Sequence, residues 1–422
     1  DVLGSRGLGD VYKRQILEQA DETDAVFGEL YSWYLRNPEY RSRVQKLVQS
    51  AFAGKPEDII SQSVAKALYG EVSPYSATRL ERFAACAFAH FLQYGMKLTE
   101  RVEYEFKPMD MGNVMHGALE SFAEEVRKRG MKWTELTEQE RNEIADRCLD
   151  NIVADYGNTV LKSSARNEYM IERTRRILRR TVWALQKQLE QGEFQPEGFE
   201  VTFGGGRIDR VDIMEDQNKV YVKVIDYKTG NTSFDLVYLY HGLQLQLMIY
   251  LDGALRVEQK KYPDKEIIPA GVFYYNIKDP MIQEKIDADV EAVSAGLMKE
   301  LKMNGLAQAD PELVYRMDSS LGSIPVAFNK DGSFRKNSSV ADRTQFAVLG
   351  RYVRTKIEKI RSSILEGDAE VSPYELGKKN ACTYCPYMTV CGFDRRLSGY
   401  EFRRLKNFSD EELWKAFDRE AE

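Results

Sequence analysis

The sequence predicts an α/β fold in which a mixed sheet is flanked by helices, in a chain of 422 residues. Two runs that alternate between apolar and polar residues, 208–213 and 220–225, are separated by a polar turn, which is typical of a β-hairpin. An amphipathic helix is predicted before the hairpin, over 110–129. Helical periodicity follows it over 240–255, and 271–277 has the pattern of a further strand.

The composition is that of a large water-soluble protein. Hydrophobic residues make up 43% of the chain and charged residues 30%, and no apolar run approaches the length of a membrane span. We therefore expect a cytoplasmic protein without membrane contact, built from one large domain with attached segments. The formal net charge of −6 gives no overall attraction to nucleic acid, so any DNA contact must come from local basic patches.

Acidic side chains occupy both strands of the predicted hairpin. Asp226 and Lys228 are two residues apart on one strand and project from the same face. Strand pairing can bring Asp209, on the neighbouring strand, close to Asp226. This set suits phosphodiester hydrolysis, because carboxylates hold a divalent cation such as Mg²⁺ and an ammonium stabilises developing charge or positions water. An Asp-x-Lys sequence on an exposed strand is otherwise usually a solvated ion pair.

The residues around these acids resemble a known nuclease core. Gly-Arg-Ile-Asp-Arg-Val-Asp at 206–212, the turn, and Ile-Asp-Tyr-Lys-Thr-Gly at 225–230 follow in the order found in the RecB-like branch of the PD-(D/E)xK superfamily. The resemblance implies a restriction-endonuclease-like sheet and a deoxyribonuclease that depends on Mg²⁺ or Mn²⁺. It also implies that Asp209 and Asp226 bind the metal and that Lys228 is catalytic.

Two further motifs extend the resemblance. The spacing from Gly112 to His116 resembles the first RecB-like motif, which implies that His116 approaches the metal, although a lone histidine on an apolar helix face is more often a core residue. Gln246 and Tyr250 resemble the Gln-x-x-x-Tyr motif that helps to place DNA and the active-site groups. Glu200 is a candidate additional ligand or supporting group, although a surface glutamate is the ordinary expectation.

Two basic segments are candidate DNA contacts. Arg173, Arg176 and Arg180 share one face of a helix predicted over 166–180. Residues 395–406 carry five basic side chains and one acid. Such runs are most often solvated surface. The functional interpretation is that the arginines contact phosphates and that 395–406 lines a DNA path or docks a partner.

Four cysteines form a candidate metal centre. Cys382, Cys385 and Cys391 have the spacing Cys-x-x-Cys-x₅-Cys, and Cys86 lies far upstream in a helix predicted over 76–98. Four thiolates bind either an iron–sulfur cluster or a structural zinc ion, and the spacing leaves both open. A disulfide is not expected in a reducing cytosol.

The cysteine pattern resembles the iron–sulfur staple in the B subunit of AddAB-type helicase-nucleases, which implies a [4Fe-4S] cluster. The resemblance runs from about residue 16 to the end. It implies a helical remnant of an inactivated helicase-like region at 16–72, a nuclease domain at 73–395 and a basic, helical tail at 396–422. Residues 1–15 resemble translated adapter sequence, and we expect them to be a non-native lead.

This resemblance implies a metal-dependent DNA exonuclease module that processes double-strand break ends for recombinational repair. DNA, especially single-stranded ends, would be the substrate, and the A subunit would be the partner. No Gly-x-x-x-x-Gly-Lys-Ser/Thr loop occurs in the sequence, so ATP hydrolysis is not expected of this chain. Two alternatives are a self-sufficient iron–sulfur exonuclease of the Cas-associated type and a module that binds DNA ends without cutting them.

Overall fold

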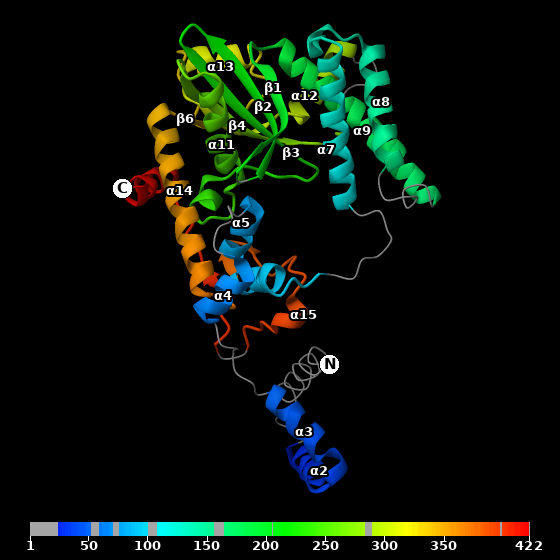
Figure 1. Cartoon of the computed structure of the whole chain (residues 1–422), viewed down its shortest axis with the longest axis vertical. Coiled ribbons are helices and arrows are strands. Elements are labelled where there is room, and N and C mark those ends of the chain that lie inside the picture. The colour runs from blue at the N-terminus through cyan, green and yellow to red at the C-terminus, as the bar shows by residue number, and fades with distance from the viewer. Residues whose placement is uncertain are drawn as a thin grey trace.

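A mixed sheet lies at the centre of the protein (Figure 1). The computed structural model describes residues 24–51, 59–70, 76–99, 108–155, 164–204, 206–282, 289–396 and 399–421. The sheet has six strands in chain order, namely β1 (Gln195–Phe203), β2 (Gly206–Asp216), β3 (Lys219–Lys228), β4 (Glu266–Asn276), β5 (Asn304–Gln308) and β6 (Val340–Ala341). Strands β3 and β4 are parallel, as are β5 and β6, and the other neighbours are antiparallel. The predicted fold class is confirmed.

The predicted hairpin is formed by β2 and β3. Its turn is short, because Asp216 pairs directly with Lys219 across the two residues Gln217 and Asn218. The antiparallel register continues to the pair of Arg210 and Ile225. This register carries the two strand ends that bear the predicted acids to the same edge of the sheet.

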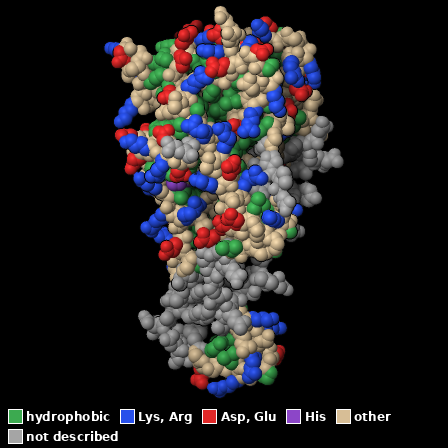
Figure 2. Space-filling view, turned by 60° about the vertical axis from the view of Figure 1, so that its left-hand side comes forward, with side chains coloured by type: hydrophobic (Ala, Val, Ile, Leu, Met, Phe, Trp, Pro, Cys, Tyr) green, Lys and Arg blue, Asp and Glu red, His purple; other side chains and the backbone are tan. Residues whose placement is uncertain are grey.

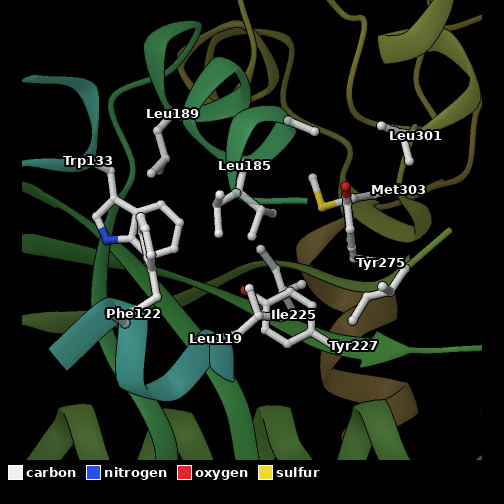
Figure 3. Packing of buried hydrophobic residues seen from close by; sticks show 14 of the residues in the cluster. Leu119, Phe122, Trp133, Leu185, Leu189, Ile225, Tyr227, Tyr275, Leu301 and Met303 are labelled. Carbon is white, nitrogen blue, oxygen red and sulfur yellow. The ribbon is translucent and has the colours of Figure 1, made fainter. Parts of the chain in front are cut away.

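One face of the sheet is covered by the helices α7 (Pro108–Lys128), α8 (Glu138–Asp155) and α9 (Ala165–Glu190) (Figure 1). Leu119 of α7 lies beside Ile225 and Tyr227 of β3, Leu185 of α9 points toward them, and Phe122 of α7 packs against Trp133 (Figure 3). These side chains are almost fully buried. Burial of each one stabilises the fold by about 1.5–3 kcal/mol, so this packing fixes α7 against the strands.

The opposite face packs against α5 (Ala77–Ala85), α11 (Gln246–Lys261) and α14 (Arg343–Glu366). Val220, Val222 and Val224 of β3 are fully buried on this side, while Ile225 and Tyr227 belong to the first face. Because side chains alternate along a strand, β3 reads as a nearly continuous apolar run that is buried on both faces.

Two predicted helices are shorter than their sequence pattern indicates. Ser76 caps α5 as expected, but the helix predicted over 76–98 stops at Cys86, where φ is −166° and the backbone is extended. The segment then continues as α6 (Ala87–His90) and a π-helical turn, Phe91–Gly95. The helix predicted over 240–255 is also divided, because α10 (Leu236–Tyr240) ends before Gly242, which has a φ of +78°, and α11 begins at Gln246.

The remaining elements extend this core. They are α2 (Asp24–Arg36), α3 (Pro38–Ala51), α4 (Gln62–Tyr69), the 3₁₀ turn Trp133–Glu135, α12 (Val290–Glu300), α13 (Pro311–Met317), β7 (Tyr374–Leu376), β8 (Lys379–Asn380), α15 (Met388–Cys391), β9 (Arg403–Arg404) and α16 (Asp410–Ala421). Helices α2 and α3 lie apart from the sheet (Figure 1). The expected lead at 1–15 is outside the described residues. Within the described part of the chain, no helix combines the length and apolar character needed to cross a membrane.

Candidate active site

The hairpin brings the two predicted acids and the predicted lysine together. Asp226 is 1% exposed and Asp209 is 8% exposed. The Lys228 Nζ lies 2.6 Å from Asp226 Oδ2. The backbone N–H of Tyr227 donates to Asp209 Oδ2 at 2.7 Å, which fixes this carboxylate against β3. All three side chains line one open pocket of about 540 Å³.

Two further side chains approach Asp209. His116 Nδ1, on α7, lies 3.4 Å from Asp209 Oδ2 and 3.8 Å from Glu200 Oε1. Glu200 lies on β1 with a φ of +50°, a left-handed conformation that costs about 1–3 kcal/mol in a residue other than glycine. Its carboxylate also forms an ion pair with Arg207. The strained backbone thus belongs to a residue that faces the acidic cluster.

Helix α11 supports the lysine from the other face of the sheet. Lys228 Nζ donates to Gln246 Oε1 at 2.7 Å, and Gln246 Nε2 donates to the Tyr250 hydroxyl at 2.9 Å. Gln246 and Tyr250 are one helical turn apart and therefore share a face. A continuous chain of polar contacts runs from Tyr250 through Gln246 and Lys228 to Asp226.

The carboxylates repel one another and attract positive charge. Burial and the neighbouring Asp209 raise the pKa of Asp226 to about 7, against the opposing effect of Lys228. Burial disfavours the charged form of His116, but hydrogen bonds to Asp209 and Glu200 outweigh burial and raise its pKa to about 10. The cluster therefore holds a cation well, whether a proton on His116 or a metal ion that replaces it.

The donor set fits a divalent cation. His116, Glu200 and Asp209 each offer one ligand atom, and these atoms all lie within 4.8 Å of one another. Carboxylate oxygens are the usual ligands of Mg²⁺, while an added imidazole is also compatible with a transition metal such as Mn²⁺. Asp226 lies in the same pocket and could supply a further oxygen.

The four cysteines also converge, although more than 290 residues separate the first from the rest. They line one pocket between the break after α5 and the loop that leads into α15. Burial, followed by the nearby Cys391, Cys86 and Cys385, raises the pKa of the Cys382 thiol to about 12. Backbone N–H groups point at two of the sulfurs, including the N–H of Phe393 at 3.3 Å from Cys391 Sγ. Such hydrogen bonds favour thiolates.

Two segments were predicted to contact DNA. Most of their arginines and lysines that the structure describes form contacts within this chain. Arg176 pairs with Asp279 at 2.6 Å, and Arg180 lies over the ring of Trp183. In the second segment, Arg403 donates to a backbone carbonyl of α5 and Arg404 lies 3.7 Å from Glu375. Lys and Arg are mixed with Asp and Glu over the face drawn in Figure 2. The side chains of Arg176 and Arg404 are nevertheless 63% and 78% exposed, so DNA contact by these segments stays a prediction.

The sequence pattern missed two residues at the site. Arg207 lies within the quoted motif at 206–212 but was given no role, although strand alternation places it on the same face as Asp209, beside Glu200. Glu81 was not predicted, because it meets the site only through a contact between residues 164 positions apart. No local signal in the sequence marks that contact.

A mixed sheet in which buried carboxylates and a lysine meet at the ends of two strands is the arrangement expected of a metal-dependent nuclease. The chain belongs to the PD-(D/E)XK nuclease superfamily, whose family model matches residues 74–392. The predicted superfamily is thereby confirmed.

Curated proteins that are named as the B subunit of an ATP-dependent helicase/deoxyribonuclease are similar to nearly the whole chain. The one from Lachnoclostridium phytofermentans is 41% identical over 95% of this chain and 36% of its own length. Those from Thermoanaerobacter sp. and Clostridium acetobutylicum are each 33% identical, over 95% and 96% of this chain and 37% of their own lengths. The chain thus spans little more than a third of these relatives.

Proposed function

We propose that this chain hydrolyses phosphodiester bonds in DNA with the help of a divalent cation, Mg²⁺ or Mn²⁺. The observation that carries the proposal is the convergence of Asp209, Asp226 and Lys228 at one edge of the sheet, in an open pocket. Membership in a nuclease superfamily supports the reaction class.

Some residues of the site bind the cation, and Lys228 acts on the water or the phosphate. Asp209 and Asp226 hold the cation, and His116 and Glu200 complete its ligands from α7 and β1. When bound, the cation polarises the scissile phosphate and makes a water molecule more acidic. Lys228 places its ammonium beside Asp226, where it orients the attacking water or stabilises the charge that develops on the phosphate.

The test is cleavage of end-labelled single-stranded DNA by the purified chain with Mg²⁺, with Mn²⁺ and with EDTA. We expect cleavage only with a metal, and loss of cleavage in Asp226→Ala. Asp216→Ala is a matched control, because Asp216 lies on the same hairpin at the opposite, exposed end. Full activity of Asp226→Ala would refute the assignment of the site.

We further propose that the chain is the nuclease portion of a helicase-nuclease B subunit that processes double-strand break ends for recombinational repair. The name shared by the three relatives supports a place in a helicase-nuclease, and the role in break repair follows from the sequence resemblance. Single-stranded DNA ends are then the substrate, and an A subunit is the partner. Adding an A subunit to the cleavage assay tests the partnership, since a self-sufficient exonuclease would gain nothing from it.

The four cysteines are proposed to hold a [4Fe-4S] cluster, with zinc as the alternative. In a zinc site with bonds of 2.3 Å the sulfurs lie about 3.8 Å apart. Four thiolates suit either group, so the metal content of the purified protein decides between them.

A further inference from the structure

Glu81 caps a helix that belongs to a distant part of the chain. Its Oε1 accepts the backbone N–H of Leu245 at 2.7 Å and that of Gln246 at 3.0 Å. These two residues begin α11, and the side chain of Leu245 makes no capping hydrogen bond of its own. Because the first N–H groups of a helix have no partners within it, α11 depends on α5 for this cap.

The sequence of α11 leaves no local substitute for Glu81. A Ser, Thr, Asn or Asp at the N-cap position would cap the helix locally, by accepting the N–H of its second or third residue. Position 245 is instead a leucine that is fully buried in the core between α11 and the sheet. Because the N-cap residue Leu245 packs in the core and has no polar side chain, an acceptor for the N–H groups at the start of α11 has to come from another part of the chain.

The capped residue is the one that holds the lysine. Gln246 accepts the Lys228 Nζ at 2.7 Å, and Lys228 in turn lies 2.6 Å from Asp226. The position of the first turn of α11 thus sets the position of the lysine ammonium. A displacement of about 1 Å in such a contact can cost about a hundredfold in rate.

Burial of the Glu81 carboxylate beside α11 costs free energy. Although part of the residue is exposed, burial around its carboxylate raises the pKa to about 7, against the two backbone N–H groups and Lys228. A buried carboxylate is unfavourable unless its hydrogen bonds are made. The contact with α11 supplies these bonds.

We propose that Glu81 is a positioning residue for the nuclease site, which caps α11 from α5 and so makes Gln246 hold Lys228 at Asp226. The inference rests on the proposed function, because it acts through Lys228. Helix α5 ends at Cys86, so the cap and the cysteine pocket are attached to the same helix.

The first experiment compares Glu81→Ala, Glu81→Gln and Glu258→Ala in the full chain with Mg²⁺. Glu258 is a matched control, since it is 1% exposed on the same helix but about 18 Å along it from Gln246. We expect Glu81→Ala to lower kcat about a hundredfold with KM for DNA unchanged. Glu81→Gln keeps an acceptor oxygen and is expected to stay within about threefold of the wild type, a change of less than one kcal/mol in the barrier.

A double-mutant cycle then asks whether Glu81 acts through Gln246. Gln246→Ala alone is expected to lower kcat, and adding Glu81→Ala to it should produce no further loss. Independent losses that multiply would overturn the proposal, as would a Glu258→Ala protein that loses as much kcat as Glu81→Ala.

Hydrogen exchange separates this inference from the proposed function. In Glu81→Ala, the peptide that contains Leu245 and Gln246 should exchange about tenfold or more faster, whereas Glu81→Gln should protect it as the wild type does. If the wild type cleaves no DNA, the proposed function fails while exchange still decides whether the cap exists. Unchanged exchange in Glu81→Ala would overturn the cap itself.

Discussion

Arg210 and Asp212 form an ion pair inside the core, two residues apart on β2. The Arg210 Nε lies 2.5 Å from Asp212 Oδ1, and its Nη2 lies 2.9 Å from Oδ2. Lys223 approaches the same carboxylate at 3.0 Å. The rings of Trp133 and Phe199 each lie 5.7 Å from the guanidinium carbon. One carboxylate thus contacts two buried basic side chains, on the hairpin whose strands also carry Asp209 and Asp226.

Loss of this carboxylate should destabilise the fold severely. Asp212→Ala leaves the charge of Arg210 buried without its counterion, and we expect it to lower the free energy of unfolding by about 3–5 kcal/mol. Urea denaturation measures the effect. Asp216→Ala removes an exposed partner of Arg316 from the same strand and should cost less than about 1 kcal/mol. Equal losses in the two variants would contradict the structural role of the buried pair.

Asp226 should lower the stability of the metal-free folded protein, although the proposed catalysis requires it. Burial and Asp209 raise its folded-state pKa to about 7, so ionisation costs folding free energy. The cost is absent well below the ordinary pKa of 3.8, where the carboxyl is protonated in both states, grows between about pH 4 and 7, and stays constant above pH 7. In EDTA at pH 8, the free energy of unfolding of Asp226→Asn should be about 1–4 kcal/mol higher than that of the wild type. With Mg²⁺ present, this variant should cleave no DNA. Equal stability at pH 8 would contradict this pKa shift.

His90 should make the protein sensitive to acid. It is fully buried, and burial followed by the nearby Arg79 lowers its pKa to about 3. Because the unfolded state binds a proton near pH 6.5, stability should fall below that pH by up to about 1.4 kcal/mol per unit. His90→Gln keeps an acceptor for Arg79 Nε. It should reduce this slope by up to about 1.4 kcal/mol per pH unit, the contribution of one proton, as measured by urea denaturation between pH 4 and 8. An unchanged slope would show that His90 is charged in the folded protein.

Cys86 should be required for the metal centre at the far end of the chain. Protein purified without oxygen should be brown and contain roughly four irons per chain. Cys86→Ala should lose the iron and become sensitive to protease near both ends of the nuclease region, because the cluster ties them together. Cys148→Ala is the control, since Cys148 is buried among α7, α8 and α9. One tightly bound zinc would contradict the cluster, and full iron in Cys86→Ala would contradict Cys86 as a ligand.

Local patterns predicted the hairpin and its acids, because strand alternation and a polar turn specify β2 and β3 within one stretch of sequence. They failed where tertiary structure overrides periodicity. The amphipathic pattern continues through Cys86, yet the backbone is extended there. The period also runs through residues 240–245, where Gly242 turns the chain before α11. Glu81 meets Leu245 only when α5 packs on α11, so no local pattern could place it in the site.

The separation of the cysteines along the chain sets an order for assembly. Cys86 leaves the ribosome about 300 residues before Cys391, a delay of roughly 15–60 s at ordinary rates of synthesis. During this time its thiol has no completed centre to join and depends on a reducing environment. A chain that ends before residue 382 lacks three of the four sulfurs, although it already contains Asp209, Asp226 and Lys228. Acquisition of the metal group would therefore distinguish a finished nuclease from a truncated one.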